Sequence, residues 1–128
     1  MPTPEQVRER VETYAKTFSA GDREGWLECF ADGAIQRDPV TAPPNIGREA
    51  IGIFWDNVHA LADEMTLDVH QVHVCGDEGV LIFTAINKMQ GGGIQVDNIV
   101  DIFRIDDEGK IAEQRAYWDP SAMKPLTT

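Results

Sequence analysis

The spacing of hydrophobic residues changes once along the chain, near residue 64, and this change limits the folds open to it. Before residue 64, apolar side chains recur every three or four positions, as they do on one face of an α-helix. After it, they alternate with polar side chains, as they do in a strand with one buried face. We therefore predict an α+β fold in which three N-terminal helices cover one face of a curved antiparallel sheet.

The helical part contains clear start and stop signals. The first expected helix begins at Thr3-Pro4-Glu5-Gln6, which has the residues of a capping box with proline in the first turn, and it ends at Gly21. Asp22 is expected to cap a short second helix that carries Trp26, Leu27 and Phe30. A brief extended segment follows at residues 34–38, and residues 50–61 form a third, amphipathic helix.

Four strands are expected in the second half of the chain. The expected strands cover residues 65–74, 80–89, 94–105 and 111–118 and are separated by glycine-containing turns. Between Val69 and Val72 the alternation slips by one residue, which predicts a bulge in a bent strand. Helices that lean on a bent sheet leave a conical hollow, so we expect a small-ligand pocket there.

Length and charge exclude several classes of partner. The chain has 128 residues, so we expect residues 1–128 to form a single domain. Its 11 Lys and Arg against 22 Asp and Glu give a formal net charge of −11, which disfavours nucleic acid and anionic membrane surfaces. The longest apolar stretch is too short for a bilayer, and the N-terminus lacks the pattern of a signal peptide. We therefore expect a cytoplasmic protein.

We expect no metal site. Neither Cys29 nor Cys75 belongs to a CxxC pair. His70 and His73 are three residues apart in a strand-like segment and so face opposite sides of it, which is poor geometry for a shared metal. His59 lies alone on a helix, and all three histidines are interpreted as structural or surface residues.

Three residues can carry chemistry, although each also has a structural interpretation. Asp38 directly precedes a proline, so it lies extended at a strand end, but the same pair commonly starts a turn. Tyr14 lies on the apolar face of the first helix, where its hydroxyl points either into the hollow or to a backbone carbonyl. Asp101 is the only charge between Ile99 and Phe103. It is either buried, where it takes up a proton and becomes a donor, or solvated together with Asp97.

Several short motifs together carry a family resemblance. They are Ala20-Gly-Asp22, Phe30-Ala-Asp32, Asp38-Pro-Val40, Gly47-Arg-Glu-Ala-Ile51, Val100-Asp-Ile-Phe-Arg104, Asp107-Glu-Gly-Lys-Ile111 and Ala116-Tyr-Trp118. With them, the chain from about Val7 to Trp118 resembles the Δ5-3-ketosteroid isomerases, within the NTF2-like and SnoaL-like superfamily of cone-shaped α+β domains. The specific part of the resemblance is the joint presence of Tyr14, Asp38 and Asp101.

The resemblance implies a reaction that needs no cofactor. Asp38 matches the base that moves a proton from C4 to C6 of a 3-oxo-Δ5-steroid. Tyr14 and a protonated Asp101 match the two donors to the 3-oxygen of the substrate. Ketosteroid isomerases are a known example of two carboxyl groups kept in different protonation states by their surroundings.

The resemblance also implies residues that contact the substrate. These are Phe30, Phe54, Trp55, Val100 and Trp118. Phe30 and Trp55 fall where some members have tyrosines that extend the hydrogen-bond network behind the catalytic tyrosine. Phe30 has no donor, and Trp55 offers only an indole N–H. Gln114 is polar at a strand position where an apolar residue would be expected against a steroid.

Two other functions stay open, because one fold can host many activities. One is a non-catalytic or vestigial domain that binds a steroid or another apolar molecule, and the other is a SnoaL-like polyketide cyclase. An epoxide hydrolase of this shape is excluded, because it has an arginine two residues before the strand aspartate, where this chain has Ile99.

We also expect a homodimer. Four apolar residues are predicted on the outer face of the sheet: Val80, Ile82, Val100 and Ile102. An exposed apolar sheet face suggests association with a second copy.

Overall fold

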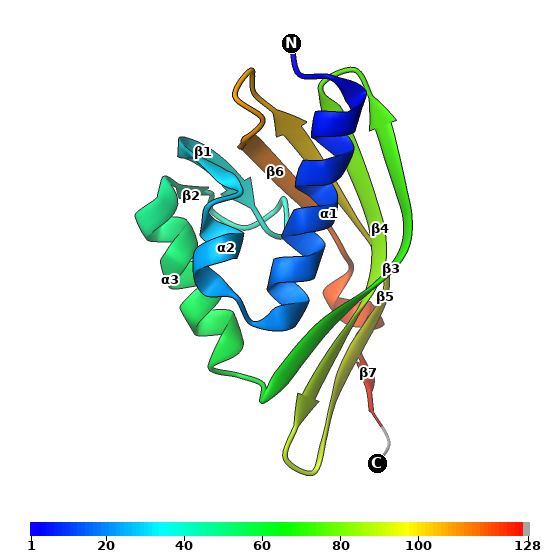
Figure 1. Ribbon diagram of the computed structural model, residues 1–128. Coiled ribbons are helices and arrows are strands. Elements are labelled where there is room, and N and C mark those ends of the chain that lie inside the picture. The colour runs from blue at the N-terminus through cyan, green and yellow to red at the C-terminus, as the bar shows by residue number, and fades with distance from the viewer. Residues whose placement is uncertain (127–128) are drawn as a thin grey trace.

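The computed structural model describes residues 1–126 and places three helices on one side of a strongly curved sheet (Figure 1). The elements are α1 Pro4–Ala20, α2 Arg23–Leu27, β1 Phe30–Arg37, β2 Asn45–Ile46, α3 Arg48–His59, β3 Glu64–Cys75, β4 Glu78–Met89, β5 Gly92–Ile105, β6 Ile111–Tyr117, the 3-10 turn Pro120–Ala122 and β7 Lys124–Pro125. This arrangement confirms the predicted α+β cone.

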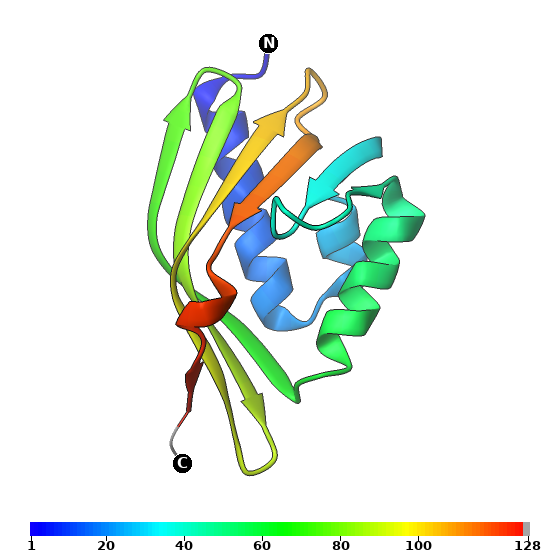
Figure 2. The ribbon, with the colours of Figure 1, turned by 180° about the vertical axis from the view of Figure 1, so that it is seen from behind.

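The sheet has the strand order β2-β1-β6-β5-β4-β3, and β7 pairs with β5 outside this path. All neighbours are antiparallel except β1 and β6, which run parallel. Figure 2 shows the chain continuing beyond β6 in the same direction, through the 3-10 turn to β7, which pairs with the start of β5.

Two irregularities accompany the curvature of the long strands. The register of β3 against β4 shifts between Val69 and Gln71, which confirms the predicted bulge. A second shift lies in β5 around Asn98, whose φ of 53° is the left-handed conformation found at bulges. Because a bulge increases the local bend of a strand, these sites help the sheet to curl toward the helices.

The predicted helix signals of the N-terminal part are all used. The backbone N–H of Thr3 donates to Gln6 Oε1 at 2.8 Å, and Gln6 N donates to Thr3 Oγ1 at 3.2 Å, which completes the capping box. Gly21 ends α1 in the left-handed conformation with φ 69°, and Asp22 Oδ1 accepts from Gly25 N at 3.0 Å to cap α2.

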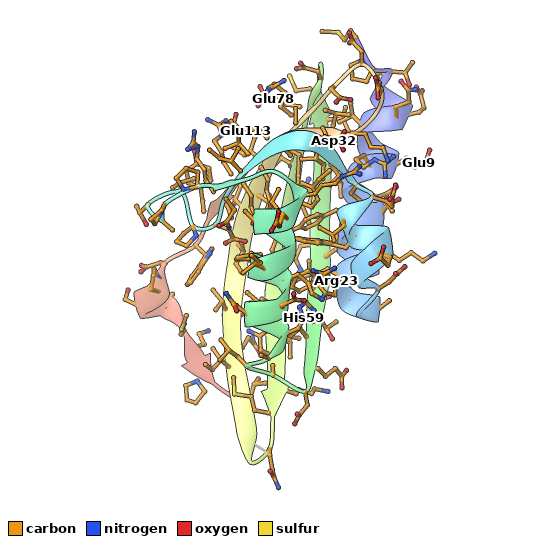
Figure 3. All side chains as sticks on the ribbon, turned by 90° about the vertical axis from the view of Figure 1, so that its left-hand side faces the viewer. Glu9, Arg23, Asp32, His59, Glu78 and Glu113 are labelled. Atoms are coloured by element: carbon orange, nitrogen blue, oxygen red, sulfur yellow. The ribbon has the colours of Figure 1, made fainter. Side chains whose placement is uncertain are left out.

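The core lies between α1, α3 and the concave face of the sheet. Its aromatic centre consists of Tyr14, Phe18, Trp26, Phe30 and Trp55, all buried. On β4, a Cβ at Gly79 would lie 2.6 Å from Val11 Cγ2, so only glycine lets α1 approach this strand so closely. Arg23, labelled in Figure 3, pairs with Asp56 at 2.9 Å and ties α2 to α3.

Several element boundaries differ from the prediction. Helix α3 covers Arg48–His59 rather than residues 50–61, and Leu61 lies beyond it with 72% of its surface exposed. Strand β1 begins at Phe30, which was expected in the second helix, because Phe30 pairs with Ile111 of β6. The short strands β2 and β7 were not predicted, since such short pairings depend on distant partners and leave no periodic pattern.

The four apolar residues expected on the outer face of the sheet are partly exposed. Val80, Ile82, Val100 and Ile102 are all half-buried, and the homodimer stays a prediction.

Within residues 1–126, none of the helices combines the length and apolar character needed to cross a bilayer.

Candidate active site

A cavity of about 270 Å³ opens between the helices and the concave face of the sheet. Tyr14, Asp38 and Asp101 all line it. The rest of the lining is mainly apolar and includes Phe18, Phe54, Val58, Met65, Phe83 and Trp118. The volume is close to the lower end of the range of about 300–1,000 Å³ for small-molecule sites. The structure thus brings the three candidate catalytic residues, Tyr14, Asp38 and Asp101, into one pocket.

Asp101 is buried, with only 1% of its surface exposed. Its Oδ2 accepts a hydrogen bond from Gln114 Nε2 at 3.0 Å, and its Oδ1 has no hydrogen-bond partner among residues 1–126. Asp97, by contrast, pairs with Lys124. The alternative in which both carboxyl groups share a solvated face is therefore wrong.

Tyr14 reaches the same part of the cavity from α1. Its hydroxyl oxygen accepts from Gln114 Nε2 at 2.8 Å, and within residues 1–126 it makes no hydrogen bond to a backbone carbonyl, as an ordinary core tyrosine would. Its ring packs edge-on against Phe103, with ring centroids 4.8 Å apart, and it is tilted against Trp26 at 5.7 Å. These contacts hold the ring so that its hydroxyl stays beside Asp101.

Asp38 follows the last residue of β1 and is half-buried. Trp118, just after β6, donates its indole N–H to Asp38 Oδ1 at 2.8 Å. The next part of the loop is held by a hydrogen bond from Val40 N to Ala116 O at 3.0 Å. The carboxyl group is therefore positioned by the neighbouring strand and faces the cavity.

The apolar surroundings shift the proton equilibria of all three groups. Burial raises the pKa of Asp101 well above its usual range, and the nearby charge of Asp38 raises it further, while the Gln114 hydrogen bond offsets part of the rise. Burial also raises the pKa of Asp38, against the stabilising N–H of Trp118. The pKa of Tyr14 is raised by burial and by both aspartates. The cavity therefore favours the neutral forms of Tyr14 and Asp101 most strongly, and these neutral acids can donate hydrogen bonds to a ligand.

The raised pKa of Asp101 predicts a particular dependence of stability on pH. Unfolded aspartate titrates near pH 4, whereas folded Asp101 keeps its proton to higher pH. Its stabilising contribution is therefore complete below about pH 4 and is lost as the pH rises through the folded pKa. In Asp101→Asn, which cannot ionise, the free energy of unfolding should fall less between about pH 5 and pH 9 than in the wild type.

Urea denaturation at several pH values measures this difference. Asp97→Asn is the matched control: the pKa of Asp97 is lowered, first by its hydrogen bond from Lys124, so its removal should not flatten the decline at high pH. Parallel curves for the wild type and Asp101→Asn would show that Asp101 titrates as an ordinary surface carboxylate.

The predicted substrate contacts are only partly placed at the cavity. Phe54 and Trp118 line it, whereas Phe30, Trp55 and Val100 do not. Val100 points to the opposite face of β5 from Asp101, because neighbouring side chains of a strand alternate. Contrary to the prediction, Val100 therefore does not line the cavity in which a ligand would bind.

The two aromatic residues expected behind Tyr14 lie in the core away from the cavity. Phe30 is fully buried and packs edge-on against Tyr14 at 6.1 Å and against Trp26 at 4.8 Å. Trp55 stacks on His59 with ring centroids 3.7 Å apart and an interplanar angle of 16°. Within residues 1–126, neither makes a hydrogen bond to Tyr14. Phe30 supports the tyrosine by direct packing, whereas Trp55 packs against Phe18 and Trp26, which in turn contact Tyr14.

Sequence reasoning missed a set of buried amides. Gln36 and Gln114 are fully buried, and Gln36 Nε2 donates to Gln114 Oε1 at 3.2 Å. Asn45 Nδ2 donates in turn to Gln36 Oε1 at 3.0 Å. The polarity of Gln114 in an apolar strand was a signal, but no local pattern indicated Gln36 or Asn45.

Within residues 1–126, no three His, Cys, Asp or Glu side chains are grouped so that they could hold a metal ion. Cys29 is buried and Cys75 is exposed, and both are free thiols. His70 bonds to Thr84 Oγ1 through its Nε2 at 2.7 Å. The polar side chains that line the cavity are those of Tyr14, Asp38, Asn87 and Asp101.

The fold and the cavity define a class of protein: an α+β cone that encloses an apolar pocket with acidic groups at its wall. Residues 11–114 match the family model of the SnoaL-like domain, and the chain belongs to this family.

Solved structures of similar proteins cover nearly the whole chain. Rv0760c from Mycobacterium tuberculosis is 25% identical with a TM-score of 0.86, covering 98% of this chain and 99% of that one. The same protein in complex with estradiol-17β-hemisuccinate is 26% identical with a TM-score of 0.82, over 93% and 98% of the two chains. A computationally designed 17-OHP binder is 25% identical with a TM-score of 0.83, over 96% and 98%.

Proposed function

We propose that this protein is a steroid Δ-isomerase that moves the C5–C6 double bond of a 3-oxo-Δ5-steroid into conjugation with the 3-carbonyl. The observation that carries the proposal is the convergence of Tyr14, Asp38 and Asp101 on one apolar cavity. The apolar lining suits a rigid hydrocarbon ligand, and a similar protein binds a steroid derivative.

The two aspartates take different roles because their surroundings differ. Two negative charges in one apolar cavity repel each other, so one carboxyl group holds its proton. Asp101, fully buried among apolar residues, is the neutral one, with its pKa raised well above the usual range. Asp38 is only half-buried, and the Trp118 N–H at 2.8 Å stabilises its carboxylate. Asp38 is therefore the base.

The reaction follows from these roles. The Asp38 carboxylate removes a proton from C4, which the adjacent 3-carbonyl makes acidic, and the electron pair moves into a dienolate. The oxygen of the dienolate accepts hydrogen bonds from the Tyr14 hydroxyl and from Asp101 Oδ1–H, whose oxygen has no partner among residues 1–126. Asp38 then returns the same proton to C6. No atom is gained or lost and nothing is oxidised, so no cofactor is needed.

The test is to mix the protein with 5-androstene-3,17-dione and to follow the ultraviolet absorbance of the conjugated 4-ene product. We expect formation of this product at a rate above that in buffer and proportional to the protein concentration. A rate equal to that in buffer would overturn the isomerase proposal.

Steroid binding without turnover is the second candidate function. It is favoured by the similar structures, one bound to estradiol-17β-hemisuccinate and one designed to bind 17-OHP. Equilibrium titration with estradiol-17β-hemisuccinate, read together with the absorbance assay, separates the two candidates, because a pure binder would take up this compound and leave the Δ5-substrate unchanged.

A further inference from the structure

We infer that Gln114 is the positioning residue for both hydrogen-bond donors of the cavity, and that Gln36 and Asn45 fix its orientation. The catalytic part of this inference rests on the proposed isomerase function. The structural part, the control of Asp101 and Tyr14 by Gln114, does not.

Gln114 contacts both acids through a single nitrogen. Its Nε2 lies 2.8 Å from the Tyr14 hydroxyl oxygen and 3.0 Å from Asp101 Oδ2. An amide nitrogen has two hydrogens, so each acid receives one. Because Gln114 is fully buried, water does not compete for these hydrogen bonds.

The pairing of four adjacent strands places the amides in a row. In the register of the sheet, Asn45 of β2 is the partner of Gln36 in β1, and Gln36 is the partner of Gln114 in β6. Gln114 in turn pairs with Phe103 of β5, two residues from Asp101 and therefore on the same face. The row of amides thus ends at the cavity wall.

The hydrogen bonds along this row all run in one direction. Asn45 Nδ2 donates to Gln36 Oε1 at 3.0 Å, and Gln36 Nε2 donates to Gln114 Oε1 at 3.2 Å. With Gln36 oriented in this way, a flipped Gln114 amide would turn its nitrogen toward Gln36 Nε2, so that two donors would face each other without an acceptor. The row therefore keeps the N–H groups of Gln114 directed at Tyr14 and Asp101.

This orientation determines where the two acids can place their own protons. Since the Tyr14 oxygen and Asp101 Oδ2 both accept from Gln114, the Tyr14 hydrogen is left to be donated elsewhere. The proton of neutral Asp101 resides on Oδ1, the oxygen without a partner among residues 1–126. The Tyr14 hydroxyl and Asp101 Oδ1–H can then both donate to a single ligand oxygen that accepts two hydrogen bonds, such as that of a carbonyl, an enolate or a phenolate.

Gln114 thereby takes a role that the aromatic neighbours of Tyr14 do not fill. Phe30 has no donor, and Trp55 stacks on His59. Within residues 1–126, the hydrogen bond to the tyrosine oxygen comes from the sheet, through the Gln114 amide, and Trp26 of the aromatic cluster adds a smaller effect that lowers the pKa of Tyr14.

The first experiment replaces Gln114 by methionine, which has a similar length and no donor. The pKa of Asp101, followed by NMR of protein labelled with ¹³C at the aspartate carboxyl groups and assigned with Asp101→Asn, should rise, because the Gln114 hydrogen bond lowers it. The kcat of isomerisation should fall by about 10- to 100-fold with little change in KM. The reason is that the variant loses a hydrogen bond to Asp101, which stabilises the negative charge that develops on the dienolate oxygen. An unchanged or lower pKa in the folded variant would overturn the inference.

The second experiment changes the row of amides at Asn45, which is separated from the two acids by Gln36 and Gln114. Asn45→Ala lies at the half-buried far end, so it should fold, and it should raise the pKa of Asp101 in the same direction by a smaller amount. Ile111→Val, a fully buried change in the same strand as Gln114, is the control and should leave this pKa unchanged.

The two sets of data separate the inference from the proposed function. If the wild type shows no isomerisation, the NMR measurement still decides whether Gln114 controls Asp101. If Gln114→Met does not fold, Asn45→Ala decides it, and an unchanged pKa there would refute the proposed row. If isomerisation occurs but neither variant raises the pKa, the function stands and the role of Gln114 is wrong.

Discussion

Asp38→Asn should remove nearly all isomerisation of 5-androstene-3,17-dione. Asp38 is the only proposed base of the cavity and acts in both proton transfers, so its loss should lower kcat by about 10²–10⁴-fold, the usual contribution of general acid–base catalysis. The amide oxygen of asparagine can still accept the Trp118 N–H that Asp38 Oδ1 accepts at 2.8 Å. Substrate binding should therefore survive, and KM should change little.

Steady-state kinetics of the purified variant measure both constants. Asp32→Asn is a matched control, because Asp32 lies in β1, the strand that Asp38 follows, with its side chain 96% exposed, and it should keep the wild-type kcat. A wild-type rate in Asp38→Asn would show that another group is the base, whatever the fold.

Tyr14→Phe and Asp101→Leu should each lower kcat by about 10²–10³-fold, the usual effect of removing one donor to a developing oxyanion. Each loss should be partial, because the other donor remains. Tyr14→Phe keeps the ring that packs against Phe103 at 4.8 Å, so the fold should be preserved. The double variant should lose less than the product of the single losses, since both residues share Gln114.

The kcat values of the two single variants and the double variant test this expectation. Tyr117→Phe, which removes the other tyrosine of the chain at a position 41% exposed, is the control and should keep the wild-type kcat. If Tyr14→Phe or Asp101→Leu keeps the wild-type rate, that residue does not hold the oxyanion.

Local signals predicted most of the fold. The capping box at Thr3, the left-handed end of α1 at Gly21 and the bulge between Val69 and Gln71 involve residues close in sequence, so their physical causes are readable there. Strand boundaries were less accurate where pairing is non-local. The start of β1 at Phe30 depends on a partner in β6, and no local pattern reports it.

For the candidate site, too, some features could be predicted from local sequence and others depended on packing. Tyr14, Asp38 and Asp101 could be singled out because a helical face, an Asp-Pro pair and an isolated charge are visible in the sequence. Whether these three residues meet is a matter of packing, and the cavity that they share settles it. Phe30 and Trp55 could not be placed correctly from the sequence, because a buried aromatic ring fits a pocket wall and a core equally well.

By itself, the sequence determined the type and order of the helices and long strands and the identity of the acidic groups, because periodicity, capping and side-chain chemistry are local properties. The tertiary structure alone decided that Asp101 is buried and that Val100 faces away from it. It also joined Gln36 to Gln114 across 78 positions of the chain. Burial and hydrogen-bond direction arise from contacts between strands that are distant in sequence, and these contacts set the pKa of Asp101 and the orientation of its donor.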